Sequence, residues 1–219
     1  FKFIDKIYAQ SELDKERLKS LGAGEIEVVG NIKAAFLPSV SRVYEKPKAR
    51  VIVLASTHTG EEEMILDNLN LKENDLLIIA PRHPERFAEV EKISGEYAKK
   101  HDFSFAKFSQ THKFEAKINL LDTLGELVNV YAISDVVVLG GSFAPNIGGH
   151  NPIECAQFNP VIISGEFIFN QKALFSLVEN IYIAKASEIG GIMSSDAKKS
   201  KIAVQASADA IIEDIRSTL

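Results

Sequence analysis

The sequence predicts an α/β domain built on a parallel, doubly wound sheet. Segments rich in β-branched residues alternate with segments of helical period along the whole chain. The predicted strands are nearly continuous apolar runs, such as the one from Val136 to Leu139. Runs of this kind are typical of parallel strands that are covered by helices on both faces. Side chains suited to cap a helix also stand where several helices should begin.

The alternation sets the order of the elements. Strands are expected at residues 7–10, 26–29, 50–55, 76–80, 103–108, 135–140, 160–163 and 181–184. Helices are expected at residues 12–21, 60–69, 84–100, 125–133, 152–158, 171–179 and 196–216. The polar stretch 38–48 contains two prolines and is the expected seam. We therefore divide the chain into a strand–helix–strand segment, residues 1–37, and a larger α/β domain, residues 38–219.

Three helix starts carry specific cap signals. Ser11 can cap the first helix. Thr59 followed by Glu62 fits a capping box, in which each side chain bonds the other residue's backbone N–H. Asn151, followed by Pro152 and Glu154, supplies an N-cap, a proline at the first helical position and an acid in the first turn.

Composition excludes several classes of protein. The formal net charge is −5 and no Lys/Arg-rich block occurs, so the charge footprint of a nucleic-acid-binding protein is missing. The single cysteine, Cys155, rules out an internal disulfide and suits a reducing compartment. No apolar run reaches transmembrane length and no signal peptide is recognised, so a soluble chain is expected. Because the first residue is Phe1 and not Met, we expect a piece of a longer protein.

The segment from Gly140 to Glu154 carries the strongest ligand-binding signal. It follows an apolar strand and leads into a capped helix. Glycines let a backbone approach a ligand closely, and a helix N-terminus offers free N–H groups to a phosphate. Glu154 can accept hydrogen bonds from both hydroxyls of a ribose, or it can serve as a cap partner only. The loop does not fit the dinucleotide fingerprint G-x-G-x-x-G.

Three further polar loops follow predicted strands. Arg82, in the segment 80–87, is placed to bind a phosphate or carboxylate, the alternative being a solvated arginine beside a surface turn. The backbone near Gly125 can contact a base edge, although a plain capped helix explains that segment equally well. Residues 55–63 add hydroxyls and acids. Because the carboxyl ends of parallel strands share one edge, the four loops together predict a nucleotide pocket at a topological switch point.

The order and content of these loops resemble the C-terminal half of the bacterial 3-deoxy-D-manno-octulosonic acid (Kdo) transferases. The similar stretches cover most of residues 9–175. They are Ala9-Gln10-Ser11-Glu12, Gly30-Asn31-Ile32-Lys33, Ala55-Ser56-Thr57-His58-Thr59-Gly60-Glu61-Glu62, Ala80-Pro81-Arg82-His83-Pro84-Glu85-Arg86-Phe87, Asp122-Thr123-Leu124-Gly125-Glu126-Leu127 and Gly148-Gly149-His150-Asn151-Pro152-Ile153-Glu154. The arginine-histidine-proline and glycine-histidine-asparagine blocks are fairly specific to the family when they occur together.

The resemblance implies the Rossmann-like C-terminal domain of a GT-B glycosyltransferase, in which two halves face each other across a cleft. It implies transfer of Kdo from CMP-Kdo to a lipid A precursor in lipopolysaccharide biosynthesis, with inversion and without a metal or cofactor. It places the full-length enzyme at the cytoplasmic face of the bacterial inner membrane. The general base and acceptor site would lie in an N-terminal half, of which residues 1–37 are the end or the hinge. This chain alone is therefore expected to be inactive.

The family pattern also assigns site residues. The implied nucleotide contacts are Pro81, Arg82, Leu124, Gly125, Glu126, Asn151, Pro152, Ile153 and Glu154. Further donor contacts are expected at Ser56, Thr57, His58, Ser142, Gly148, Gly149 and His150. No catalytic residue and no metal ligand are expected within this chain.

The sequence departs from the family pattern in three places and leaves other functions open. Cys155 stands where proline is frequent, Phe158-Asn159 replaces small residues, and the segment 164–167 replaces a glycine-proline-histidine type of turn. The last departure leaves open how the donor sugar is held. The alternatives are half of another GT-B enzyme that uses a UDP-sugar, a sugar-nucleotide epimerase of similar architecture, or a non-catalytic nucleotide-binding module.

Overall fold

The computed structural model describes residues 1, 3–32, 35–203 and 208–218. The chain forms two compact units, a larger one of Pro38–Ile202 and a smaller one of Phe1–Leu37 with Ala203–Leu219. The division after residue 37 falls where the sequence places its seam. The C-terminal segment differs from the expectation, because it groups with the smaller unit and not with the domain that precedes it.

The larger unit is built on a seven-stranded sheet in the order β10-β8-β7-β3-β4-β6-β5. All neighbouring strands are parallel, which confirms the predicted fold class. The strands are β3 (Arg50–Thr57), β4 (Asp75–Pro81), β5 (Phe105–Lys107), β6 (Ile118–Leu120), β7 (Val136–Leu139), β8 (Val161–Ser164) and β10 (Ile181–Ile183). The chain leaves β3 toward β4 on one side and later returns to β7 on the other side. The switch point therefore lies between β3 and β7.

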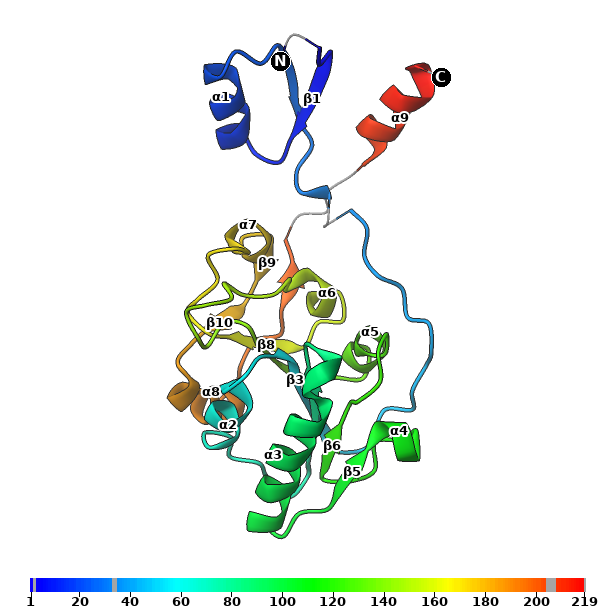
Figure 1. Cartoon of the computed structure of the whole chain (residues 1–219), viewed down its shortest axis with the longest axis vertical. Helices are drawn as coiled ribbons and strands as arrows, with labels where there is room; N and C mark the ends of the chain where they lie inside the picture. Colours follow the sequence, from blue (N-terminus) through cyan, green and yellow to red (C-terminus); the bar gives the residue numbers. More distant parts are fainter. Residues whose placement is uncertain (2, 33–34, 204–207, 219) are drawn as a thin grey trace. The chain divides into compact units, whose positions relative to one another are not determined.

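Helices cover both faces of this sheet (Figure 1). Side chains of β3 alternate between the faces. Ile52 and Leu54 pack in one core cluster with residues of α2 (Glu61–Leu66), α3 (Phe87–Lys100) and α8 (Ile189–Ser194). Val51 and Val53 are equally buried and point to the opposite face, where α5 (Leu127–Tyr131) contacts β3 and α6 (Ile153–Ala156) contacts α5.

Short elements complete the larger unit. They are the 3-10 turns η2 (Pro84–Arg86) and η3 (Ala186–Glu188), the helices α4 (Phe108–Thr111) and α7 (Lys172–Phe175), and the strands β9 (Val178–Glu179) and β11 (Lys201–Ile202). The two strands pair antiparallel.

The smaller unit combines the parallel strands β1 (Lys6–Ala9) and β2 (Glu25–Val28) with α1 (Glu12–Ser20) and α9 (Asp209–Thr218). The Ser11 hydroxyl accepts a hydrogen bond from the Asp14 N–H at 3.2 Å, so the predicted cap of α1 is confirmed. The Tyr8 hydroxyl on β1 donates to Asp214 on α9 at 2.7 Å. This bond ties the C-terminal helix to the N-terminal strand.

Two predicted helices are wrong in extent. A single helix at residues 196–216 does not form, because Lys201 and Ile202 pair with β9 and α9 begins only at Asp209. Residues 204–207 of that predicted helix lie outside the described residues. The helix expected at 171–179 ends at Phe175, and Val178 and Glu179 form β9. In both cases the local sequence pattern is typical of a helix, but the residues form a strand because they pair with a segment more than 20 residues away.

The capping box predicted at Thr59 and Glu62 is also wrong. Gly60 caps α2, with a φ of 85° and no side-chain hydrogen bond. Glu62 instead turns inward and is fully buried, where it accepts a bond from the Thr57 hydroxyl at 2.6 Å. Asn151 lies one residue before the N-cap residue of α6, which is Pro152, but its side-chain oxygen still accepts a hydrogen bond from the Ile153 N–H at 3.0 Å.

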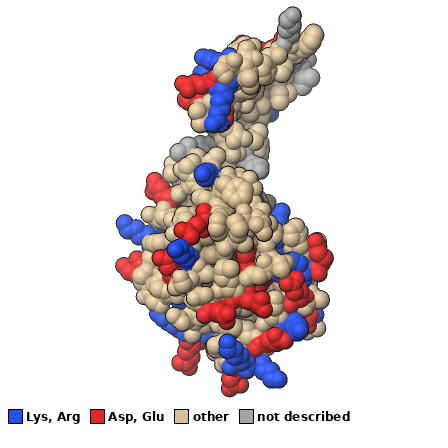
Figure 2. Space-filling view, turned by 60° about the vertical axis from the view of Figure 1, so that its left-hand side comes forward, with Lys and Arg blue, Asp and Glu red and all other residues tan. Residues whose placement is uncertain are grey.

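The surface carries charges of both signs. On the face drawn in Figure 2, acidic and basic side chains are interspersed over the larger unit. Among the described residues, no helix has both the length and the apolar character needed to span a bilayer.

Candidate nucleotide-binding site

The loops selected from the sequence meet at the carboxyl edge of the parallel sheet. β3, β4, β6 and β7 end at Thr57, Pro81, Leu120 and Leu139, and each is followed by one of these loops. Ligands of open α/β sheets bind at this edge, beside the switch point. The fold thus gathers segments that are up to about 100 residues apart in the sequence.

A pocket of about 130 Å³ lies between the ends of β3, β4 and β6. Five residues predicted to contact the donor line it, namely Ser56, Pro81, Arg82, Leu124 and Gly125. Ala80, Phe87, Leu121, Thr123 and Leu127 complete the lining. Because complete small-molecule sites usually enclose about 300 Å³ or more, this pocket has room for one ring of a ligand, with the remainder lying along the open edge.

Ser56 owes its place in the pocket to an irregularity at the end of β3. The register of β3 against β4 shifts between Ala55 and Thr57, and Ser56 takes a φ of 55°, which is unusual for a residue other than glycine. The neighbouring Tyr131 is fully buried. Burial raises its pKa well above the usual value, with Glu154 adding to the effect and Ser56 and Arg82 opposing it. Tyr131 therefore lies within electrostatic reach of Ser56, Arg82 and Glu154.

Arg82 follows β4 and presents an exposed guanidinium to the pocket. Its backbone N–H donates to the Thr57 carbonyl at 3.0 Å, which holds the residue against the end of β3. Within the part of the chain that the structure describes, its guanidinium makes no hydrogen bond or ion pair. An unpaired guanidinium at the edge of a pocket is suited to bind an oxyanion.

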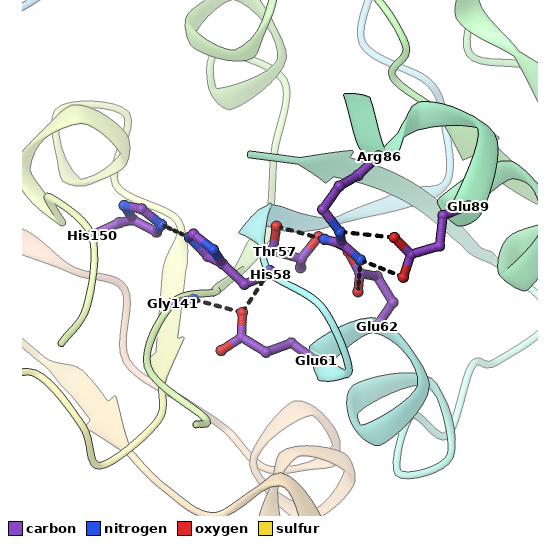
Figure 3. Close-up of polar contacts among 8 residues, drawn as sticks. All are labelled: Thr57, His58, Glu61, Glu62, Arg86, Glu89, Gly141 and His150. Carbon is purple, nitrogen blue, oxygen red and sulfur yellow. Dashed lines mark hydrogen bonds and ion pairs between the residues drawn. The ribbon is translucent and has the colours of Figure 1, made fainter. Parts of the chain in front are cut away.

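Arg86, one turn later, has a different role (Figure 3). It is buried, and its guanidinium makes two bonds to Glu62, at 2.7 and 2.9 Å, and one to the Thr57 carbonyl at 3.1 Å. It also contacts Glu89 at 3.2 Å. Burial alone would lower the pKa of Arg86, but the bonds to Glu62 and Glu89 raise it. Arg86 therefore stays charged and joins the end of β3 to α2 and α3.

The turn after β7 supplies backbone N–H groups, as predicted, but a protein carboxylate accepts their hydrogen bonds. Glu61 is fully buried and accepts from the N–H groups of Gly141, Ser142 and Phe143 at 2.7 to 3.0 Å. It also accepts from the His58 N–H at 2.9 Å. These amides are consequently not free to bind a phosphate. Glu61 instead fastens the loop after β7 to the loop after β3, across the switch point.

His58 and His150 meet above this junction (Figure 3). Their Nε2 atoms are 2.9 Å apart, and the two ring planes are inclined by only 11° with centroids 5.1 Å apart, so the rings meet edge to edge through these nitrogens. Gly141 permits this approach, because a Cβ there would lie 2.7 Å from the His150 ring. The His83 ring lies edge-on to His58 at a centroid distance of 5.3 Å.

Glu126 is placed beside the pocket, but its carboxylate is already engaged. It accepts hydrogen bonds from the Tyr44 hydroxyl at 2.6 Å and the Asn129 side chain at 2.7 Å, and it lies 3.6 Å from Arg42. A ligand could thus contact Glu126 only through its backbone atoms. The side chain instead anchors the segment 41–44 to α5.

The loop from Asn151 to Glu154 enters α6 as the sequence predicts. The Asn151 amide donates to Glu154 at 3.2 Å, so the two side chains are paired while Glu154 remains partly exposed. Pro152 and Ile153 are buried and can offer a ligand only backbone atoms. These four residues do not line the pocket described above.

Besides Ser56, four of the predicted donor contacts are buried inside the protein, namely Thr57, Ser142, Gly148 and Gly149. Thr57 bonds Glu62, and the Ser142 hydroxyl donates to the Leu139 carbonyl and accepts from the Gly165 N–H. The surroundings of Gly148 and Gly149 are filled by residues 168–170. The burial of Ser142, Gly148 and Gly149 follows from the return of the chain at 165–170, which covers the glycine loop and was not apparent from the loop sequence.

The role of Glu61 and the pairing of His58 with His150 are the site features that sequence reasoning missed. The sequence indicates Glu61 only as one of the acids in residues 55–63, and it predicts the two histidines as separate donor contacts. Its partners are 80 to 82 residues away along the chain, so no local pattern could reveal them. Among the described residues, no three or more His, Cys, Asp or Glu side chains are grouped to hold a metal ion.

Comparisons with known proteins agree with this arrangement. No protein-family model matches the chain. It is 36% identical over 178 residues to a bifunctional glycosyltransferase/methyltransferase of Fusobacterium nucleatum, covering 74% of this chain and 27% of that protein. It is 31% identical over 195 residues to the 3-deoxy-D-manno-octulosonic acid transferase of Haemophilus influenzae, covering 81% of this chain and 44% of the relative. The chain thus spans less than half the length of these relatives.

Solved structures show the same relationship. The C-terminal CMP-Kdo binding domain of WaaA from Acinetobacter baumannii is 30% identical, with a TM-score of 0.56, over 66% of this chain and 78% of that domain. Anabaena HepE, solved with UDP and glucose, is 15% identical with a TM-score of 0.52 over the whole of this chain and 64% of that one, a likeness of fold alone. The larger unit therefore has the fold of a GT-B glycosyltransferase domain. With 31% identity over 81% of the chain to one relative and 30% identity to a C-terminal domain of another, the chain belongs to the 3-deoxy-D-manno-octulosonic acid transferase family.

Proposed function

We propose that this chain binds CMP-Kdo as the donor-binding domain of a Kdo transferase. The observation that carries the proposal is the unpaired Arg82 guanidinium at the edge of a pocket lined by Ser56, Pro81, Leu124 and Gly125. Family membership supplies the ligand class, since a relative that is 30% identical is a CMP-Kdo binding domain.

The pocket suggests a division of roles. Its lining of Pro81, Leu121 and Leu124, with backbone at Gly125, suits a flat ring such as cytosine. Arg82 would then hold the phosphate as a charge-assisted contact. Glu154, on the neighbouring loop, would accept from the ribose hydroxyls.

The whole enzyme would use this domain together with an N-terminal half that binds a lipid A precursor. We propose an inverting transfer that needs no metal or other cofactor, at the cytoplasmic face of the bacterial inner membrane, as one step of lipopolysaccharide biosynthesis. The general base would belong to the N-terminal half. An assay of this chain alone with CMP-Kdo and a lipid A precursor is expected to give no product, and product formation would contradict this division.

Calorimetry or NMR titration with CMP, UMP, AMP and NAD tests the donor class. We expect CMP to bind preferentially with a Kd in the ~millimolar range, about −4 kcal/mol, because only one side of the cleft is present. An equal response to all four nucleotides would favour a general nucleotide-binding module. A preference for UMP would favour a UDP-sugar enzyme.

Arg82→Ala tests the phosphate contact. The substitution should weaken CMP binding by about 1.5–3 kcal/mol, the scale of a charged hydrogen bond, with no change in melting temperature because the side chain is exposed. Arg17→Ala is the matched control, since Arg17 is also exposed but lies on α1 of the smaller unit. Unchanged CMP binding by Arg82→Ala would remove the main support for the proposal.

A further inference from the structure

The His58–His150 pair has a hydrogen-bonding pattern that couples it to protons. With the two Nε2 atoms 2.9 Å apart, one must carry a hydrogen and the other must present its lone pair. In the neutral pair, the ring that donates through Nε2 has an Nδ1 without hydrogen, and its partner carries hydrogen on Nδ1. Both Nε2 atoms are thereby used within the pair.

One proton can be added to this pair without breaking its hydrogen bond. It would enter at the Nδ1 that lacks a hydrogen, so that the pair would present two outward N–H groups and one positive charge. A second proton would set two Nε2–H groups against each other at 2.9 Å and separate the rings. The pair is therefore limited to a single added proton while it stays intact.

The outward nitrogens are available to a ligand. Neither Nδ1 atom forms a hydrogen bond within the described residues. Both histidines are only partly buried, and neither Nδ1 is among the buried side-chain atoms that lack a partner there. A bound oxygen could accept hydrogen bonds from them.

The surroundings of the pair favour an anion. Burial, followed by the positive charge of His58, Arg82 and His83, lowers the pKa of His150 to about 4. Burial also lowers the pKa of His58. The negative charge of Glu61 opposes this decrease, whereas the charges of His83, Arg86 and Arg82 add to it. The Glu61 carboxylate accepts four backbone N–H bonds and Arg86 is paired with Glu62. Arg82 is left as an unpaired positive charge near a neutral pair.

We propose that the His58–His150 pair is an oxyanion subsite, which takes up one proton from solvent when a ligand phosphate or carboxylate binds beside Arg82. An anion stabilises the charged pair by Coulomb attraction and accepts the N–H group that protonation creates. The inference rests on the proposed function for its ligand, because CMP-Kdo carries both a phosphate and a sugar carboxylate. Either group presents the same chemistry to the pair.

Ring-nitrogen NMR of the full chain across a pH series tests this coupling. The probes are cytidine, CMP, inorganic phosphate, and CMP together with free Kdo. If the phosphate is the bound group, we expect CMP or inorganic phosphate to raise the titration midpoint of the pair by about one pH unit. Cytidine, which lacks a phosphate, should leave the midpoint unchanged. A rise only with CMP plus Kdo assigns the subsite to the carboxylate. An unchanged midpoint with every probe would overturn the subsite, and shifts of the Leu124 and Gly125 amides in the CMP sample report separately on nucleotide binding.

The pH dependence of affinity supplies a second test with variants. Because binding raises the pKa of the pair, affinity should be highest at low pH and fall as pH rises through the midpoint of the bound form. Because the pKa of His150 is about 4 before binding, we expect the Kd for the probe that raises the midpoint to increase about fivefold from pH 4 to 6.5, within the limit of about tenfold that a one-unit pKa rise allows. His150→Gln and His58→Gln should each abolish this slope, whereas His112→Asn, a histidine on the turn after α4, should keep it. Retention of the slope in both pair variants would contradict the proposal.

Discussion

At the scale of single residues, neighbouring acids of one helix have different roles because of what they face. Glu61 and Glu62 are fully buried, and Glu63 is exposed. Glu61 accepts from four backbone N–H groups, and Glu62 pairs with Arg86. A buried carboxylate is stable only with such partners. Glu61 and Glu62 thus hold the loops of the site together, whereas Glu63 faces the solvent.

Glu61→Gln should destabilise the larger unit by about 2–3 kcal/mol. The amide replaces one acceptor oxygen by an NH₂ group that faces N–H donors, so buried bonds are lost on both sides. Chemical denaturation followed by circular dichroism measures this change. Glu63→Gln is the matched control and should stay within about 0.5 kcal/mol of the wild type. Equal stability of the two variants would show that the Glu61 bonds contribute little.

Glu154→Gln separates a ribose contact from a helix cap. A cap partner needs one acceptor oxygen, which glutamine retains, so stability should change by less than about 1 kcal/mol. A ribose ligand needs two acceptor oxygens, so CMP binding should weaken clearly. Binding of 2′-deoxy-CMP should be weaker from the start and less affected by the mutation, which calorimetry on both proteins measures. Equal losses for the two ligands would assign Glu154 to the cap, where Asn151 already contacts it.

At the scale of elements, the segment 41–44 is fastened to α5 behind the pocket. The Asn129 side-chain oxygen accepts from the Ser41 and Arg42 N–H groups at 2.9 and 3.1 Å. Glu126 accepts from the Tyr44 hydroxyl at 2.6 Å. Leu124 and Gly125 line the pocket and lie just before α5. These contacts therefore fix the position of the helix that follows the pocket-lining residues.

The Tyr44–Glu126 contact should give stability a dependence on alkaline pH. Burial, followed by the Glu126 carboxylate, raises the pKa of Tyr44 from 10.0 to about 12. A group with a raised folded-state pKa contributes stability below its unfolded pKa and loses that contribution as pH rises. The stability difference between wild type and Tyr44→Phe should therefore shrink from pH 10 to 12, as measured by urea denaturation. A constant difference over this range would show that the tyrosine ionises equally in both states.

At the scale of the whole molecule, the core and the site belong to one unit. Every residue of the core cluster and every residue that lines the pocket lies within 38–202. In the smaller unit, the described strands form a two-stranded sheet held to α9 by Tyr8 and Asp214. A sheet of two strands is marginal alone, so the larger unit should provide most of the measurable stability.

Residues 38–202, expressed alone, should fold and bind CMP within about twofold of the complete chain. The expectation follows because no pocket-lining residue is removed, and one core dominates the cooperative transition. Thermal denaturation and CMP titration of both proteins provide the comparison. A loss of affinity greater than about fivefold would show that the smaller unit contributes to the site.

The sequence by itself determined the fold class, the position of most elements and the set of loops that meet at the carboxyl edge of the sheet. These depend on local properties, such as the apolar run at Val136–Leu139 and the cap at Ser11, that act within a few residues. It also selected Arg82, Leu124 and Gly125, which the structure places around one pocket, while their role in binding stays a prediction. A strand was expected ahead of the loop near Gly125, but the bounds of short β6 were not predicted. Three residues are too few to establish a period, and they form a strand between β4 and β5.

Only the tertiary structure decided which residues of those loops are accessible and which are internal. Glu61 meets Gly141 across 80 positions, and His58 meets His150 across 92. Ser142 is buried by the return of the chain at Gly165. Such contacts form where strand ends converge at the switch point, and no local pattern records which distant side chain will satisfy a buried carboxylate or an imidazole nitrogen. The sequence could therefore place the site, while the pairing of its polar groups required the fold.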